Sequence, residues 1–564
     1  MSFHAIESSF KQYLADDAET SISLGMSNKL GELSDPSMAS HKARLSDAKQ
    51  LLEKIHDEKA EEFYNNLDLR LMSLHLQQDI FFNTLEFNDK LQRRQKPCGV
   101  DGISEGVFQL FINDTRSPSA RLDNILSRLS QAPIHLKKEI ETLDTPVKRW
   151  RDIEVEQAEG LPELFSSIVS WAELEDYPKI AELQSAIADT NIALQVYSSE
   201  LSSMLTTAEF SIGEEKVREL LSLKKIDKTP LQLRDMAATF LKDTTNEIDT
   251  LSIRLLKKYE LPSDTSTVDL HEFLNKKFRI ELQDGNIESV LEYYHEQKAK
   301  LLSFIKERDL FPVMENQDMV IIKTPGFLEP VIPAGAMWPP ISLREGIKTS
   351  LVYLTLKEDE LDEHTQLGIP VMMLHEGIPG HHLQFASASE QPSFIRKFFN
   401  APEHAEGWTT MLEDYMLDQG LVENELLDEV RFIAKRDISR LSARVGIDLF
   451  FMTGDKKYLE LGFDLDYTDE DPFVNAGKLL KEATGFTDGR VQAELNWYST
   501  ERGYPLSYLT GNQMVWALKQ DIVTQNKKQL ALEELDKEFH RIFLLSGCMP
   551  VNSLRKVYEH EGFL

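Results

Sequence analysis

The sequence is poor in cysteine, in long hydrophobic runs and in positive charge. Only Cys98 and Cys548 occur among 564 residues, so one disulfide is the most that the chain can form, and a disulfide framework is excluded. Neither cysteine stands near the start, where lipidation would need it. No window approaches the roughly eighteen apolar residues that a membrane span requires. We therefore expect a chain without a membrane-spanning or lipid-anchored segment.

The N-terminus and the charge balance also argue against an association with membranes. The first residues, MSFHAIESSFKQYL, lack a basic region followed by an apolar one and are typical of an amphipathic helix. The formal net charge is −32, from 94 acidic and 62 basic side chains. Such a surface repels phosphate backbones and anionic lipid, although solubility alone accounts for it. We expect a cytoplasmic protein with no nucleic-acid or membrane partner.

Helical periodicity dominates the sequence. The hydrophobic content of 41 % is ample for a large core. Apolar residues recur on one helical stripe in 245–259 and again in 287–305. Similar stripes, typical of helices that face a core, run through 42–90, 120–142, 162–205 and 213–241. The sequence therefore predicts a mostly α protein, and it contains no internal repeat and no long low-complexity linker.

The pattern changes near residue 310. MVIIK (319–323) and TSLVYLTL (349–356) are short β-rich runs, separated by a segment rich in proline and glycine. They predict a small antiparallel sheet immediately before a histidine-rich segment. We expect an N-terminal helical region over 1–310 and a core over 311–564 that carries the sheet and the candidate site, the two joined as one continuous structural unit.

The segment LHEGIPGHHLQ (374–384) contains three histidines and one glutamate. On a regular helix, His375 and His381 would differ by about 600° of rotation and about 9 Å of rise, so they would point to different sides. His375 and His382 would share a face but lie about 10.5 Å apart, too far for one zinc ion with bonds of about 2.0–2.1 Å. A regular helix therefore cannot chelate a metal here.

The residues between these histidines are not those of a regular helix. Pro379 lacks an amide hydrogen and crowds the carbonyl four residues back, while Gly377 and Gly380 permit unusual dihedral angles. Such a segment can loop out two residues and resume, which places His381 where an HExxH zinc motif has its second histidine. A loop of three residues would place His382 there. The alternative without a metal is a Gly-Pro-Gly break that carries surface histidines.

A catalytic zinc ion also needs a third protein ligand and a position for water. EGWTTMLEDYM (406–416) carries Glu406 and Glu413, seven residues apart on one helical face, and a returning helix would bring Glu406 against the histidines. Two imidazoles and a carboxylate let zinc lower the pKa of its water to about 7. Glu376 would accept the proton, and a tyrosine, histidine or arginine would stabilise the oxyanion. A solvated acidic face accounts for the same glutamates without a metal.

These segments together resemble a known family. HEGIPGHHLQ followed by EGWTTMLEDYM resembles a widespread bacterial family of undefined function, predicted zinc metallopeptidases that bear HExxPGHxxQ. That family is similar in turn to the carboxypeptidase Taq metallopeptidases, which carry the plain HExxH. The stretch 494–512 resembles a segment of those carboxypeptidases, and 539–554 resembles the closing segment of the family. The matching residues in 494–512 are Trp497, Gly503, Tyr504, Tyr508 and Gly511.

The resemblance implies a mostly α, multi-helix metallopeptidase-like fold of the carboxypeptidase Taq or gluzincin type, with a long groove. It implies that His375, His381 and Glu406 bind one Zn2+ per chain. It also implies that Glu376 is the general base and that Tyr508 is a candidate oxyanion donor. Substrate-binding or bracing roles of lower rank fall to His382, Gln384, Glu413, Tyr504, Arg344 and His540, of which His540 is also explained as a core histidine.

Three functions fit this sequence. The first is a zinc-dependent, carboxypeptidase- or oligopeptidase-like metallopeptidase that hydrolyses short peptides in a groove roofed by the N-terminal helices. The second is a helical binding or scaffold protein without turnover, and the third is a zinc hydrolase of another amide or ester. The expected partner is a peptide substrate. The sequence leaves the resident metal and the oligomeric state open, with a homodimer as the candidate assembly.

Overall fold

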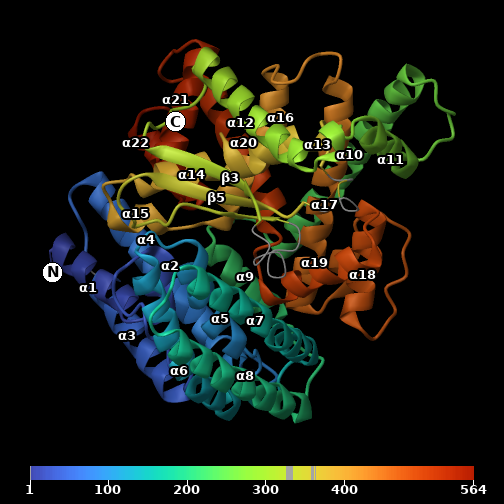
Figure 1. Cartoon of the computed structure of the whole chain (residues 1–564). Coiled ribbons are helices and arrows are strands. Elements are labelled where there is room, and N and C mark those ends of the chain that lie inside the picture. Colours follow the sequence, from blue (N-terminus) through green and yellow to red (C-terminus); the bar gives the residue numbers. More distant parts are fainter. Residues whose placement is uncertain (1, 57, 325–334, 357–360, 362–363) are drawn as a thin grey trace. The chain divides into compact units, whose positions relative to one another are not determined.

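The computed structural model describes residues 2–56, 58–324, 335–356, 361 and 364–564. The described chain is mostly α-helical with two small sheets, which confirms the predicted helical class (Figure 1). It divides into two compact units. Unit 1 comprises 1–210, 324–346 and 393–395, and unit 2 comprises 211–323, 347–392 and 396–564. The expected division into 1–310 and 311–564 stays a prediction.

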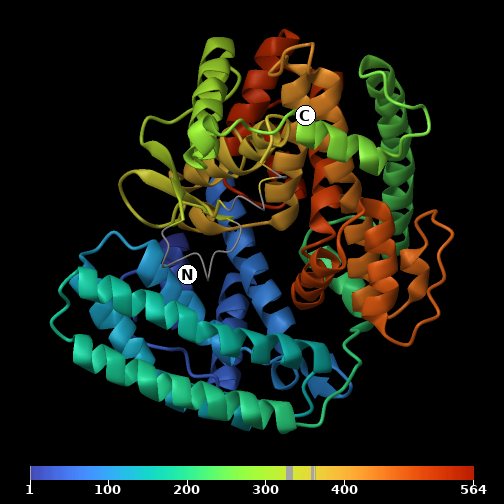
Figure 2. The same ribbon diagram turned by 45° about the vertical axis from the view of Figure 1, so that its right-hand side comes forward.

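Unit 1 is built from long helices and one short hairpin. Helices α6, α7 and α8 lie side by side in both views (Figures 1 and 2). The antiparallel hairpin β1–β2 follows α4 directly. The elements of unit 1 are α1 (Phe3–Ala15), α2 (Ala18–Leu24), α3 (Met38–His56), α4 (Phe63–Thr84), β1 (Glu86–Phe87), β2 (Lys90–Leu91), η1 (Gln92–Arg94), α5 (Gly99–Ile112), α6 (Pro118–Thr142), α7 (Lys148–Leu174), α8 (Ile180–Ser203) and β4 (Gly335–Trp338).

Unit 2 holds the segments that the sequence singled out. Short helix α15 (Phe394–Phe398) contains a boundary between the units. The other elements of unit 2 are α9 (Gly213–Leu223), α10 (Pro230–Lys258), α11 (Thr267–Lys277), η2 (Gln283–Gly285), α12 (Glu288–Arg308), β3 (Gln317–Lys323), β5 (Lys348–Leu354), α13 (Gly368–Met372), η4 (Met373–Gly377), α14 (His381–Ser389), α16 (Pro402–Asp418), α17 (Leu427–Thr453), η5 (Lys456–Leu459), α18 (Pro472–Thr484), α19 (Asp488–Thr500), α20 (Ser507–Gln525), α21 (Leu532–Leu545) and α22 (Val551–His560).

The prediction of an antiparallel sheet before the histidine segment was wrong in direction. Strands β3 and β5 lie where the sequence placed strands, but they pair in parallel, with Gln317 opposite Lys348 and Lys323 opposite Leu354. The physical reason is the connection, because 324–347 is longer than the dozen or so residues that a parallel crossover needs. Alternating apolar residues alone carry no information about strand direction.

Helices α16 and α20 cross at two glycines. A Cβ atom on Gly511 would lie 2.0 Å from the carbonyl oxygen of Glu403, and one on Gly407 would lie 2.4 Å from the carbonyl carbon of Gly511. Only glycine permits backbones to approach this closely. The crossing fixes the start of α20, which carries Tyr508, against the start of α16, which carries Glu406.

None of the helices that the structure describes is long and apolar enough to cross a membrane. Both cysteines are free thiols.

Candidate metal centre

The helix that carries the histidine segment breaks where the sequence predicted. Helix α13 opens into a π-helical turn over Met373–Gly377, the backbone leaves the helix at 378–380, and α14 begins at His381. The break is thus a widened turn followed by three non-helical residues, in place of the predicted loop of two. Gly380 is required at this point, since a Cβ atom there would lie 2.0 Å from the carbonyl oxygen of His375.

Helix α16 holds the broken segment in place. The indole Nε1 of Trp408 donates a hydrogen bond of 2.9 Å to the carbonyl oxygen of Pro379. This side chain is fully buried and stacks on Phe543, with ring centroids 4.6 Å apart. One turn of α16 therefore joins the break to the core of unit 2, next to Glu406.

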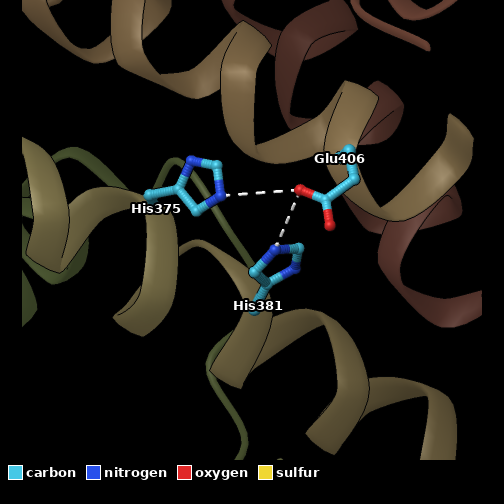
Figure 3. A group of neighbouring side chains, drawn as sticks. All are labelled: His375, His381 and Glu406. Carbon is cyan, nitrogen blue, oxygen red and sulfur yellow. Dashed lines mark ion pairs between the residues drawn. The ribbon is translucent and has the colours of Figure 1, made fainter. Parts of the chain in front are cut away.

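His375, His381 and Glu406, which we call the metal group, converge on one point (Figure 3). Glu406 Oε2 lies 3.6 Å from His375 Nε2 and 3.4 Å from His381 Nε2, and one ligand atom from each residue lies within 4.8 Å of the others. The side chains are only 15 %, 8 % and 4 % exposed. The three predicted ligands are therefore brought together in a buried group that can hold a metal ion.

The donor atoms of the metal group fit a tetrahedral ion. Bonds of about 2.0–2.2 Å in tetrahedral geometry place neighbouring ligand atoms about 3.3–3.6 Å apart, which matches the two contacts of Glu406. These contacts are too long for good hydrogen bonds. Glu406 Oε2 is buried and has no hydrogen-bond partner among the described residues. A buried carboxylate oxygen that faces two imidazole nitrogens in this way could share a cation with them.

Two further side chains orient the imidazoles. His375 Nδ1 lies 2.8 Å from Glu413 Oε1. An imidazole that donates to this carboxylate through Nδ1 can bind a metal ion through Nε2. His381 Nδ1 has a longer contact of 3.4 Å with Gln384 Oε1. Histidine ligands of metals commonly have such outer partners. Glu413 and Gln384 thus contact the outer ring nitrogens of the two histidines, and their roles stay predictions.

His382, the alternative second ligand, is directed elsewhere. Its Nδ1 lies 2.7 Å from Ser350 Oγ on β5, and its Nε2 lies 2.5 Å from Gln317 Oε1 on β3. Burial lowers its pKa to about 4, so the ring is neutral. Both ring nitrogens are occupied, which leaves His381 as the partner of His375. His382 joins α14 to the sheet.

Two tyrosines of the segment 502–508 surround the Glu406 carboxylate. The Tyr504 hydroxyl donates a hydrogen bond of 2.7 Å to Glu406 Oε1. Burial, and next the Glu406 charge, raise the pKa of Tyr504 and of Tyr508, so both remain protonated donors. The hydroxyl of Tyr504 is thus used in a hydrogen bond to Glu406. Tyr508, in contrast, lines the neighbouring cavity.

Asp448 of α17 fixes the tyrosine segment, and sequence reasoning missed it. Its fully buried carboxylate accepts hydrogen bonds of 3.0 Å from the backbone amides of Gly503 and Leu506, which flank Tyr504. Burial raises its pKa to about 7. The available signal was an isolated acid in GIDLFF (446–451), an otherwise apolar stretch of helix.

A cavity of about 580 Å³ lies beside the metal group within unit 2. His375, Glu376, Glu413 and Tyr508 form part of its wall. Glu376 directly follows His375 and remains partly exposed, as a base that meets substrate must be. Four arginines also line this cavity, namely Arg436, Arg440, Arg444 and Arg490. None of them was predicted from the sequence.

Two other sequence candidates do not join the metal group. His540 of α21 contacts the carbonyl oxygen of Leu310 through Nδ1 at 2.9 Å and stacks on Phe311, so it is a core histidine. Arg344 belongs to unit 1, where its guanidinium donates to the carbonyl oxygen of Asn113.

Comparisons with known proteins give a family and a fold. The model of the family described as "Bacterial protein of unknown function (DUF885)" matches residues 19–557. A "putative lipoprotein of unknown function" from Shewanella oneidensis has a similar structure, with a TM-score of 0.76, 16% identity, and coverage of 99% of this chain and 100% of that one. A "putative lipoprotein" from Colwellia psychrerythraea has a TM-score of 0.78, 16% identity, and coverage of 99% of both chains. No curated protein matches the chain.

Proposed function

The chain belongs to the DUF885 family, bacterial proteins of unknown function, and from this premise we propose that it is a zinc-dependent metallopeptidase of short peptides. The proposal includes a metallopeptidase-like fold. The observation that carries it is the metal group, in which a buried carboxylate oxygen without a hydrogen-bond partner faces two imidazole nitrogens. A glutamate that follows the first histidine and lines a cavity supports a catalytic role over a purely structural one.

The donor set favours zinc over other metals. Two imidazoles and one carboxylate form the His2Glu set of catalytic zinc sites, which keep a further position for water. Magnesium and calcium prefer oxygen ligands alone, and structural zinc sites use four protein ligands. The outer contact of His375 with Glu413 is typical of zinc-binding histidines.

The proposed roles follow from position and protonation. A zinc ion held by the metal group would supply Lewis acidity at neutral pH. Glu376 would accept a proton from water and pass it to the leaving amine, while the hydroxyl group attacks the carbonyl carbon and the C–N bond breaks. Tyr508, protonated and in the wall of the cavity, donates a hydrogen bond to the oxyanion. Tyr504 holds Glu406 in place.

The size of the cavity supports short substrates. A volume of about 580 Å³ lies in the range of about 300–1,000 Å³ that is usual for small-ligand sites. Such a volume accommodates a few residues of a peptide. A cytoplasmic location, a peptide partner and a homodimer stay predictions.

Two measurements on the purified protein test this proposal. Elemental analysis should find one zinc ion per chain, and a mixture of short peptides should be cleaved, with products identified by mass spectrometry. Zinc without cleavage of any peptide, but with cleavage of other amides or esters, would mean a different hydrolase. Absence of both zinc and turnover would favour the binding or scaffold function.

A further inference from the structure

Helix α17 presents a row of arginines to the cavity. Arg436, Arg440 and Arg444 are four residues apart, so they lie on one face of the helix, and all three line the cavity. The chain as a whole carries a formal charge of −32. A row of three cationic side chains on one wall of a cavity is therefore unlike the acidic average of the chain.

The row contains donor atoms that the protein does not use. The Arg444 side chain is 7 % exposed, and its buried Nη1 has no hydrogen-bond partner among the described residues. The buried Nε of Arg440 likewise has no described partner. Arg436 donates to the carbonyl oxygen of Thr267 and forms no ion pair within the described residues. Buried guanidinium donors without partners are costly, so a ligand that accepts from them is expected.

The acids with hydrogen bonds near this row leave some of its donors without a described partner. Glu413 accepts from His375. Asp437 accepts from Arg440 Nη1 at 2.6 Å, and the Nε of Arg440 remains without a described hydrogen-bond partner. Arg444 uses Nε for the Tyr498 hydroxyl and Nη2 for Glu494. The remaining donors suit a planar anion that accepts from a guanidinium fork, such as a carboxylate.

The row lies one side chain away from the metal group. The guanidinium carbon of Arg444 is 4.4 Å from the centroid of the Tyr508 ring. That ring is 5.9 Å from the ring of Tyr504, whose hydroxyl donates to Glu406. His375 and Glu376 line the same cavity. In a peptide, the terminal carboxylate is one residue, about 3.8 Å between Cα atoms, beyond the last peptide bond. A carboxylate at the row is thus suitably close for that bond to reach the metal group.

We propose that Arg440 and Arg444 bind a substrate carboxylate on the leaving-group side of the cleaved bond. The substrate class is therefore peptides with a free carboxylate there, either the C-terminus or an acidic side chain of the residue that follows the bond. This inference rests on the proposed function for its substrate, but the binding of the carboxylate needs no turnover. The two can therefore be tested separately.

The test uses titration calorimetry to measure how tightly peptide probes bind to a Glu376→Gln variant. The measurement is made on the variant as purified and again after a chelator has removed bound metal. Three N-acylated dipeptides serve as probes, namely one with a free C-terminal carboxylate, its neutral amide, and an amide whose last residue is glutamate. The free acid should bind about 10- to 100-fold more tightly than the neutral amide, the range for hydrogen bonds to a charged group. Tight binding of the glutamate amide would assign the carboxylate to the side chain, and weak binding would assign it to the C-terminus.

Arg440→Gln should remove this preference. The matched control is Arg431→Gln, which lies on the same helix, is 19 % exposed against 20 % for Arg440, and pairs with Asp418 away from the cavity lining. If Arg440→Gln does not fold, Arg440→Lys keeps the charge without the fork and should lose part of the preference. Equal binding of acid and neutral amide, or an unchanged preference in the Arg440 variants, would overturn the inference.

The outcomes separate this inference from the proposed function. A carboxylate preference in a protein that hydrolyses no peptide would leave the binding site standing and remove the peptidase. Hydrolysis of acid and neutral amide at equal kcat/KM would keep the peptidase and remove the carboxylate site.

Discussion

Each unit contains a cluster of buried charged groups, and the two clusters differ in whether their atoms are paired. In unit 1, Arg93 forms an ion pair with the fully buried Glu139, and Glu139 also accepts from the backbone amide of Cys98. Nearby, Glu154 accepts from the Tyr197 hydroxyl at 2.8 Å. None of the side-chain atoms of these residues is buried without a partner in the described chain.

The metal group of unit 2 is built differently. Oε2 of Glu406 has no described hydrogen-bond partner, and the same holds for Nε of Arg440 and Nη1 of Arg444 on the neighbouring cavity wall. Hydrogen bonds within a cluster suit a role in stabilising the fold, because buried charges without them are destabilising. Several buried charged groups with atoms that lack hydrogen bonds, gathered beside a cavity, have the form of a binding site. The Glu139 cluster (Arg93, Cys98, Glu139, Glu154 and Tyr197) is thus an internal control for the metal group.

The largest effect is expected from removing a ligand. His381→Ala should lose zinc and with it all peptide hydrolysis, since two ligands remain of three. His382→Ala should retain zinc, because both of its ring nitrogens bond to β3 and β5. Elemental analysis of the two variants, purified side by side, measures the difference. Zinc loss in His382→Ala with retention in His381→Ala would show that the ligand assignment is reversed.

The general base gives the next largest effect. Glu376→Gln should keep its zinc and lower kcat by about 10²- to 10⁴-fold, because the amide cannot accept the proton of water. Zinc content and kcat are measured on the same sample. Wild-type turnover by this variant would remove the proposed role of Glu376.

The oxyanion donor should matter less. Tyr508→Phe removes one hydroxyl group from the cavity wall and should lower kcat by about 10²- to 10³-fold, with KM little changed. Circular dichroism checks that the start of α20 still folds. An unchanged rate would reduce Tyr508 to a packing contact of Arg444.

The smallest effects come from a matched pair of glutamate variants, one in each cluster. Glu413→Gln weakens the acceptor of His375 Nδ1, so zinc affinity should fall by about 10- to 100-fold, measured by competition with a chelator. Glu139→Gln should leave zinc affinity unchanged and lower the free energy of unfolding by about 1–3 kcal/mol, since Arg93 loses its charged partner. If Glu139→Gln changed zinc affinity as much as Glu413→Gln, the distinction between the clusters would fail.

The helix-breaking residues and the family resemblance together made the metal group predictable. Pro379 disfavours a regular helix at that point and Gly380 permits the break, so a second histidine could lie close to His375. The resemblance implied that this histidine is His381 and that Glu406 is the third ligand. The form of the break was less predictable, because a widened turn and a loop relieve the same clash.

Other features depend on contacts between distant segments, which the sequence does not display. The parallel direction of β3 and β5 is a property of how two separate segments pair. Arg440 and Arg444 have the periodicity of an ordinary helix, and only the fold shows that their face lines a cavity. The function of Asp448 depends on a turn more than fifty residues away in the sequence.

Anomalous scattering from crystals at the zinc absorption edge would locate the metal ion itself. We expect one zinc peak within about 2.0–2.2 Å of His375 Nε2, His381 Nε2 and a Glu406 carboxylate oxygen. A peak bound by other residues, or imidazoles of His375 and His381 that share no ion in zinc-loaded crystals, would contradict it.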